Sequence, residues 1–479
     1  MKIKKIKLIN NEFYGNIEFE FMNSNSQVMD NIILAGENGC GKTQLLNIIY
    51  EFSNLSLDGE KRNEKRIFTI VLSENEIVQI NNELGEYNRL NILDGELIVT
   101  YNYNIQPGYW ARIGISYNSK SDGQIIEKEI DASLLFSRSN INSIFKSIFS
   151  TVEINYNPQD TSIVTAKEID ENVQQSIRSG NDLASEIQQL FIDIHDNDAH
   201  EVLNWVNEHK NQVVPEDVAN RRIKRFKSAF SRVFDDLNFS KIVTENDKKK
   251  VYFEKRNKNI EIAALSSGEK QIVFRGAFLL RNQQSTKGAI ILIDEPEISL
   301  HPNWQLKIFD YYRRLFLDEN EKQTSQIFFA THSQYVLQSA LEEYANTSIM
   351  LFNREKTGVK VKTITAPVVL PTITSAELNY IAFDITSNDY HIQLYGYLQN
   401  KIAASSGNSS CSVKQCDEYI KQSKEYNQTQ HERKSSYKTT KYDTLPTYVR
   451  NAIDHPDNSR KIAPSELRTS IELLIKLCR

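Results

Sequence analysis

The chain has 479 residues, of which 40% are hydrophobic and 25% are charged, and its formal net charge at pH 7 is −5. The length indicates two or three structural units. The negative net charge excludes a chain that binds polyanions over its whole surface, but it does not exclude a local basic patch. No apolar run approaches the roughly 20 residues of a membrane span. The basic N-terminus lacks the apolar core of a signal peptide. Four cysteines are too few for a disulfide framework in a chain of this length. We therefore expect a cytoplasmic protein with reduced thiols.

The first half of the chain begins with strands. An apolar strand at residues 31–35 is followed by a glycine-rich loop and by a helix whose apolar residues recur with helical period from residue 43. Residues 60–160 contain short β-like runs, which predict an antiparallel sheet with helices. Residues 165–235 are predicted to be helical, and their second helix, after Pro215, is basic.

The second half alternates before it becomes helical. Residues 250–263 return to strand, and between residues 266 and 365 helices alternate with buried strands of the parallel type. From about residue 372 the pattern is helical, and the last helix begins at Pro464. Residues 404–445 are rich in Ser, Lys and Gln and are expected to form a mobile connection. No heptad pattern persists, so no long coiled coil is expected.

The strongest motif is GENGCGKT at residues 36–43, which matches GxxxxGK[ST] between an apolar strand and a helix. Its glycines let backbone N–H groups converge on phosphate oxygens, and the helix N-terminus adds partial positive charge. Lys42 is expected to reach the β- and γ-phosphates of ATP, and the Thr43 hydroxyl to ligate Mg²⁺. A chance glycine-rich turn is the alternative. The predicted nucleotide-binding residues are Gly36, Asn38, Gly39, Cys40, Gly41, Lys42, Thr43 and Gln44.

Two carboxylates end the apolar run at residues 290–293. Ligands bind at the carboxyl edge of open α/β sheets, which is where Asp294 and Glu295 are expected to lie. Asp294 is predicted to hold Mg²⁺ through water, and Glu295 to polarise the attacking water as general base. The alternative is a solvated acidic turn after a core strand.

The sequence LSSGEKQ at residues 265–271 resembles the signature motif of ABC and SMC ATPases, with Ser267 where glycine is usual. That resemblance implies that Ser266 and the backbone around Gly268 contact the γ-phosphate held by another subunit, and it makes Ser266, Ser267, Gly268 and Glu269 binding residues. Taken alone, SSGE would be an ordinary helix N-cap.

His332 ends the strand-like run FFAT and resembles the switch histidine of ABC ATPases, which implies a catalytic role beside Glu295 and Lys42. A histidine satisfied within the core is the alternative. His301, at the position of the D-loop, is expected to be structural. The sequence does not place the glutamine of a Q-loop, for which Gln159 is a candidate.

The order of these motifs resembles that of ABC/SMC-type ATPases. About 222 residues separate the first motif from the signature (265 − 43), which resembles the short-armed branch: RecF, the OLD ATPases, and the ATPase subunits of anti-phage systems such as PARIS (AriA-like) and Septu (PtuA-like). The implied fold is α/β, an ABC-type ATPase head with an antiparallel β subdomain and a helical insertion, followed by a mainly helical C-terminal region. The expected domains are 1–164, the helical insertion 165–240, 241–368 and 369–479.

The resemblance implies an ATPase that binds and hydrolyses Mg-ATP at a head-to-head dimer interface, with larger assemblies left open. It would act as sensor or scaffold for a partner effector, a nuclease encoded nearby, that answers a phage trigger. One alternative is a RecF-type DNA clamp whose basic helix near Arg221–Lys227 contacts phosphates. Another is an ATP-gated HEPN-like ribonuclease that uses Arg450 and His455, whose Arg-x4-His spacing also suits an exposed helix end.

Overall fold

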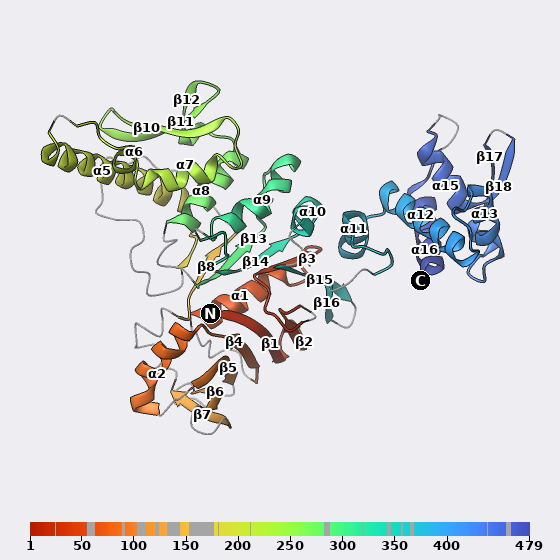
Figure 1. Cartoon of the computed structure of the whole chain (residues 1–479), viewed down its shortest axis with the longest axis horizontal. Coiled ribbons are helices and arrows are strands. Elements are labelled where there is room, and N and C mark those ends of the chain that lie inside the picture. The colour runs from red at the N-terminus through yellow and green to blue at the C-terminus, as the bar shows by residue number, and fades with distance from the viewer. Residues whose placement is uncertain are drawn as a thin grey trace. The chain divides into compact units, whose positions relative to one another are not determined.

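The computed structural model describes residues 1–23, 25–54, 63–88, 92–102, 112–119, 124–131, 144–152, 177–180, 182–210, 212–281, 288–318, 320–342, 346–355, 358–364, 368–437, 439–456 and 461–479. They form two compact units, Met1–Thr363 and Ile364–Arg479 (Figure 1). Among these residues, none of the helices combines the length and apolar character that crossing a membrane requires.

A seven-stranded sheet forms the centre of the first unit. Its order is β16-β15-β3-β14-β13-β8-β9, and β8, β13, β14, β3 and β15 pair in parallel. The strands β3, β13 and β14 are buried along their whole length, which confirms the apolar strand predicted at residues 31–35 and the buried strands of the parallel type predicted for β13 and β14. The strands are β3 (Asn31–Gly36), β8 (Ser147–Ser150), β9 (Ile177–Arg178), β13 (Ile290–Asp294), β14 (Gln326–Thr331), β15 (Thr347–Glu355) and β16 (Gly358–Ile364).

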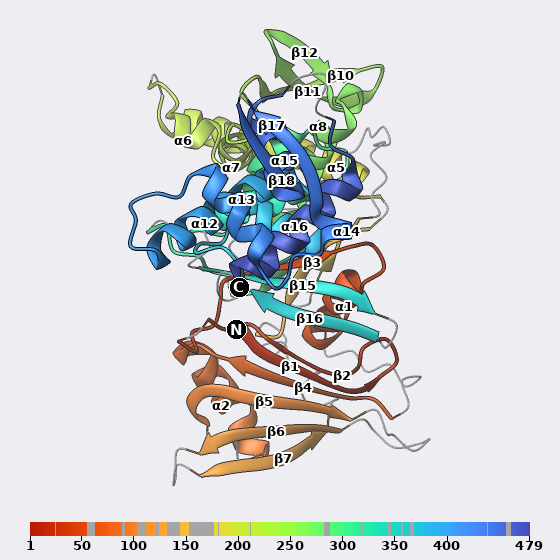
Figure 2. The ribbon, with the colours of Figure 1, turned by 90° about the vertical axis from the view of Figure 1, so that its right-hand side faces the viewer.

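A six-stranded antiparallel sheet of order β2-β1-β4-β5-β6-β7 stands beside it (Figure 2). Helix α1 (Lys42–Ser53) packs in the core that both sheets share, where Phe52 stacks on Phe68 with ring centroids 4.0 Å apart. This sheet confirms the predicted antiparallel subdomain. Its elements are β1 (Lys2–Asn11), β2 (Gly15–Glu20), β4 (Lys65–Val71), α2 (Glu74–Asn88), β5 (Ile92–Asn102), β6 (Arg112–Ser119) and β7 (Ile125–Asp131).

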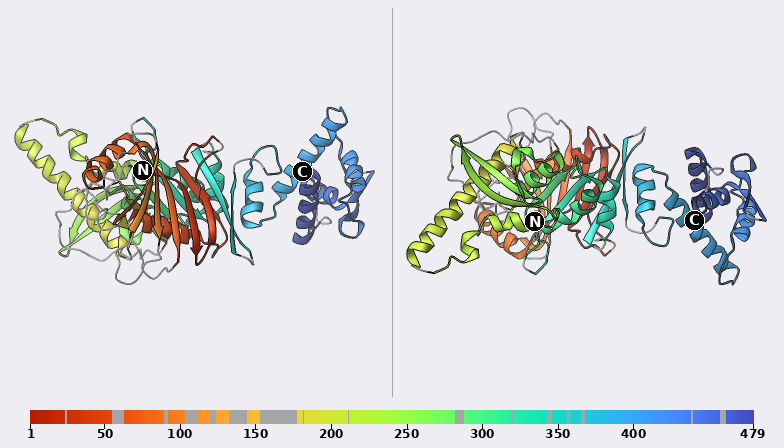
Figure 3. Two further views of the ribbon diagram at one scale, coloured as in Figure 1. Left: turned by 90° about the horizontal axis from the view of Figure 1, so that it is seen from below. Right: turned by 90° about the horizontal axis from the view of Figure 1, so that it is seen from above.

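The insertion is built on one long helix, α5 (Leu183–Glu208), yellow-green in Figure 3. Its apolar face packs on α7 and on the sheet β10-β11-β12, since the Phe191 ring contacts those of Phe226, Phe239 and Phe253. The basic helix is shorter than its pattern suggests, because only Ile223–Phe230 is a continuous α-helix. The elements are α6 (Glu216–Ala219), α7 (Ile223–Phe230), β10 (Leu237–Glu245), β11 (Lys248–Lys255) and β12 (Lys258–Glu261).

Three further helices belong to the described part of the first unit. Helix α8 (Ser267–Leu280) follows the 3-10 turn Ile262–Ala264 and is buried along nearly its whole length. Helices α9 (Pro302–Arg314) and α10 (Gln334–Glu342) pack together.

The second unit is mainly helical, as expected, and α12 lies beside α16 in its core. The predicted mobile connection at residues 404–445 is wrong, because this stretch is largely ordered into α13, α14 and the hairpin β17–β18. The buried carboxylate of Asp417 accepts hydrogen bonds from the backbone of Asp443 and Thr444 and from the Thr444 hydroxyl, which holds hairpin and helix together. The elements are α11 (Ser375–Phe383), α12 (Asn388–Ser405), α13 (Val413–Gln422), α14 (Gln428–His431), β17 (Glu432–Tyr437), β18 (Thr440–Thr444), α15 (Leu445–Asp454) and α16 (Pro464–Cys478).

Candidate active site

The glycine-rich loop joins the end of β3 to the start of α1 and has a conformation that requires glycine. Gly36 has φ 150°, and a Cβ there would lie 2.3 Å from the Phe352 carbonyl oxygen. Gly41 has φ 104°, and its Cβ would lie 2.5 Å from the Phe13 ring. No other residue fits these positions without backbone strain. The motif therefore has the bare backbone that a phosphate cradle needs at a helix N-terminus.

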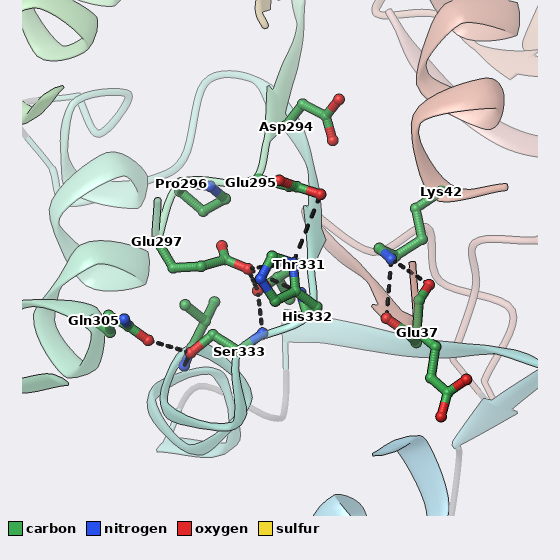
Figure 4. Close-up of polar contacts among 12 residues, drawn as sticks. Glu37, Lys42, Asp294, Glu295, Pro296, Glu297, Gln305, Thr331, His332 and Ser333 are labelled. Atoms are coloured by element: carbon green, nitrogen blue, oxygen red, sulfur yellow. Dashed lines mark hydrogen bonds and ion pairs between the residues drawn. The ribbon is translucent and has the colours of Figure 1, made fainter. Parts of the chain in front are cut away.

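Lys42 is folded back over this loop. Its side chain is buried, and its Nζ donates hydrogen bonds of 2.9 Å to the carbonyl oxygens of Gly36 and Glu37 (Figure 4). The Cys40 Sγ, also buried, lies 3.7 Å from the same Nζ. An ammonium held this way lies beside the place where the loop would receive an anion.

Thr43 and Asp294 lie side by side in the fold although they are 251 positions apart in the chain. The Thr43 hydroxyl donates to Asp294 Oδ1 at 3.2 Å. Burial is the main reason that the pKa of Asp294 is raised, to about 6. A buried carboxylate beside a hydroxyl is a hard oxygen pair, the type that Mg²⁺ prefers.

The described residues contain no cluster of three or more His, Cys, Asp or Glu side chains able to hold a metal ion. The oxygen pair of Thr43 and Asp294 still fits Mg²⁺, which in phosphate sites uses one or two protein carboxylates together with substrate oxygens and water.

Glu295 and His332 face each other where β13 and β14 end (Figure 4). The Nδ1 atom of His332 lies 3.6 Å from Glu295 Oε1. The close contact between the two side chains is the largest cause of both shifts: it lowers the pKa of Glu295 and raises that of His332. Glu295 has φ 44°, a left-handed backbone that costs about 1–3 kcal/mol in a residue other than glycine and is common at functional sites. A carboxylate that stays ionised can accept a proton from water.

The signature residues start helix α8. Ser266 is its N-cap and forms a capping box with Glu269, so the structural alternative for SSGE is present in the fold. Ser266 and Ser267 are nevertheless exposed. Gly268 is buried, and a Cβ there would lie 2.7 Å from the Ser299 carbonyl oxygen. This glycine lets α8 approach the segment after Glu295. Contact of these residues with a nucleotide stays a prediction.

Arg275 was not predicted to belong to the site. It lies in α8 with 1% of its surface exposed. Its guanidinium donates to the carbonyl oxygens of Ser150, Thr151, Asp294 and Glu295, and its Nε donates to Ser150 Oγ at 2.8 Å. One arginine thus ties the signature helix to the end of β13 and to the end of β8. The signal in the sequence was a single cation within the apolar run QIVFRGAFLL.

Replacing Arg275 by Met is expected to lower the free energy of unfolding by at least ~2 kcal/mol, since one unpaired buried acceptor costs ~1–3 kcal/mol. The matched control is Arg256→Met, because Arg256 is 81% exposed in a surface ion pair with Asp236. That variant is expected to stay within about 0.5 kcal/mol of the unmodified chain. Urea unfolding followed by circular dichroism measures both. Equal midpoints for the two variants would show that the hydrogen bonds of Arg275 do not stabilise the fold.

The other predicted residues fall in three places. Asn38 and Gly39 are exposed in the loop, while Gln44 is half-buried in the first turn of α1. Gln159 lies outside the described residues. His301 is the N-cap of α9, as a structural role requires.

Arg450 and His455, at the end of α15, are held by neighbouring side chains. Arg450 forms an ion pair of 2.7 Å with Asp454. The His455 ring stacks on Tyr437, with centroids 4.3 Å apart. These contacts favour the structural interpretation of the pair.

Comparison with known proteins places the site within a family. Residues 32–338, which include all four motifs, match the family AAA_21, described as "AAA domain, putative AbiEii toxin, Type IV TA system". No curated protein matches the chain significantly.

The chain is also similar to three solved SMC heads. One is bound to the C-winged helix domain of ScpA (14% identity, TM-score 0.44, 76% of this chain and 98% of that chain). The second is a Pyrococcus furiosus Smc head with an extended coiled coil bound to the C-terminal domain of ScpA (14%, 0.42, 76% and 96%). The third is from Thermotoga maritima (12%, 0.37, 76% and 99%). Likeness at this level transfers no residue roles.

Proposed function

The chain belongs to the AAA_21 family of AAA-domain proteins, and from this premise we propose that it binds Mg-ATP and hydrolyses it at a site completed by a second copy. The observation that carries the proposal is the meeting of five side chains at the carboxyl edge of the central sheet. These are the ammonium of Lys42, the pair Thr43–Asp294, and the pair Glu295–His332.

Each group has a role that its surroundings support. Lys42 would exchange its two loop carbonyls for phosphate oxygens, which are stronger acceptors for an ammonium. Thr43 and Asp294 would hold Mg²⁺, which when bound neutralises charge on the phosphate oxygens. Glu295 would take the proton of the attacking water, and His332 would donate a hydrogen bond to the γ-phosphate.

Completion by a second copy is supported by the signature. Ser266 and Ser267 are exposed at the start of α8, so a nucleotide held by another chain could reach them. Along the same helix, Gln271 donates to the Pro296 carbonyl at 3.2 Å and Arg275 donates to the carbonyls of Asp294 and Glu295. A displacement of one copy's signature helix would therefore also displace the backbone of its own Asp294 and Glu295.

The proposed biological role is that of a sensor or scaffold ATPase that controls a partner effector, a nuclease, in anti-phage defence. Its support is the resemblance of LSSGEKQ, IDEPEISLHP and ATHS to the motifs of that group. The family description, which names a toxin of a toxin–antitoxin system, is compatible with a defence role.

The structure disfavours the DNA-clamp alternative. Three basic side chains of this segment have partners within the chain: Arg222 pairs with Asp198 and Glu201 at 3.3 and 3.0 Å. Arg225 donates to the Leu280 carbonyl, and Lys227 contacts Asn220. Phosphate contacts would have to break these interactions.

A mass measurement tests the proposal. The purified chain is expected to double its mass with Mg²⁺ and a non-hydrolysable ATP analogue, because the nucleotide joins a P-loop to a partner's signature. The control is Lys42→Ala, which removes a charge from the phosphates and is expected to stay at its nucleotide-free mass. A chain that neither turns over ATP nor changes mass with nucleotide would contradict the proposal.

A further inference from the structure

Glu297 is a second buried carboxylate beside His332, two residues after Glu295. It has 4% of its surface exposed. Its Oε1 accepts hydrogen bonds from the Thr331 hydroxyl at 2.7 Å and from the His332 backbone N–H at 2.8 Å, and it lies 3.4 Å from His332 Nδ1 (Figure 4). One oxygen atom therefore holds both the backbone and the ring of this histidine.

The other oxygen of Glu297 makes no hydrogen bond to the described part of the chain. Within the described part of the chain, Oε2 is buried without a hydrogen-bond partner. Burying such an atom costs free energy, and a neutral side chain would hold Thr331 and His332 at lower cost. The negative charge is thus the feature of Glu297 that the packing does not explain.

The geometry decides which ring nitrogen of His332 can act. Nδ1 faces the carboxylates of Glu295 and Glu297, and ionised carboxylates only accept hydrogen bonds, so Nδ1 carries a proton. In the neutral ring, Nε2 would then be an acceptor, unable to donate to a phosphate oxygen. Donation from Nε2 requires the doubly protonated, cationic ring.

We propose that Glu297 is a positioning residue for hydrolysis, which orients His332 and supplies the counter-charge that keeps its ring cationic, so that Nε2–H donates to the γ-phosphate. This inference rests on the proposed function of His332. Three charged groups act on the ring: Glu295 and Glu297 favour its protonated form, and Lys42 opposes it. The pKa of His332 is raised, with the close contact to Glu295 as the largest cause and the charge of Glu297 among the others.

The test is Glu297→Gln, which has nearly the same shape. Its amide oxygen still accepts from Thr331 and His332, but the charge is lost. Because less negative charge then holds the ring proton, the fall of kcat at high pH is expected to move to lower pH by about one unit. Above the pH at which the ring loses its proton, kcat is expected to be lower by at most about tenfold, less than the 10²–10³ for losing a transition-state donor outright. The KM for ATP is expected to change much less than kcat, since Lys42, Thr43 and Asp294, which would hold Mg-ATP, are unchanged.

Thr331→Val is the matched control. It removes a hydrogen bond from the same Glu297 oxygen and leaves every charge in place. The pH at which kcat falls is therefore expected to stay where it is in the unmodified chain, even if kcat decreases. A merely structural role of Glu297 would make the two variants behave alike.

Thermal unfolding measures whether each variant is folded. A folded Glu297→Gln whose pH profile matches the unmodified chain would overturn the inference. If that variant does not fold, Glu297→Asp is measured instead, because its shorter side chain keeps the negative charge but places it farther from the His332 ring. A lowered kcat with a shifted pH profile supports the inference, and an unchanged pH profile overturns it. Unchanged hydrolysis by His332→Ala would instead refute the proposed function of His332.

Discussion

Glu295→Gln is expected to reduce the rate of ATP hydrolysis by about 10²–10⁴-fold, the usual contribution of a general base. The amide cannot take a proton from water, whereas Lys42, Thr43 and Asp294, which would hold Mg-ATP, are unchanged. Nucleotide affinity is therefore expected to persist, and an ATP-bound dimer to accumulate. Phosphate release measures the first effect, and mass measurement with Mg-ATP measures the second.

The matched control is Glu355→Gln, at the end of β15, where an exposed carboxylate pairs with Lys360. Surface ion pairs contribute little, so this variant is expected to hydrolyse ATP like the unmodified chain. Undiminished turnover by Glu295→Gln would remove Glu295 from the mechanism and leave its left-handed backbone unexplained.

Ser266→Arg is expected to abolish hydrolysis while each copy still binds ATP. Ser266 is exposed at the start of α8, and a bulky cation there would block docking on a partner's nucleotide without entering its own P-loop. The substitution also removes the N-cap of α8, worth ~1 kcal/mol. Thermal unfolding separates that loss from the loss of activity. Ser231→Arg, at the exposed end of α7, is the control for an added arginine.

Mixing Ser266→Arg with Lys42→Ala tests whether the site forms between copies. In the mixed dimer, one composite site pairs an intact P-loop with an intact signature, and the other carries both defects. Partial recovery of hydrolysis is expected if one functional site suffices for turnover. Full activity of Ser266→Arg by itself is the result that would contradict the head-to-head arrangement.

The sequence by itself determined the elements whose causes are local. Glycine at residues 36 and 41 is required by the loop backbone, and uninterrupted apolar runs produce the buried strands β3, β13 and β14. The last helix begins at Pro464 as predicted, since proline suits the first turn of a helix. The P-loop and the paired carboxylates could be read for the same reason: their chemistry depends on residues that are adjacent in the chain.

Only the tertiary structure decided what lies around those motifs. Arg275 meets Ser150 across 125 positions, and Thr43 meets Asp294 across 251. In the sequence, Glu297 is one more acidic residue in a loop. Only in the fold does one of its oxygen atoms accept hydrogen bonds from both Thr331 and His332. Residues 404–445 have the composition of a linker, yet one buried carboxylate, Asp417, orders their hairpin. Composition and periodicity report which residues avoid water, but a buried polar residue is specified by partners distant in the chain, which sequence patterns do not encode.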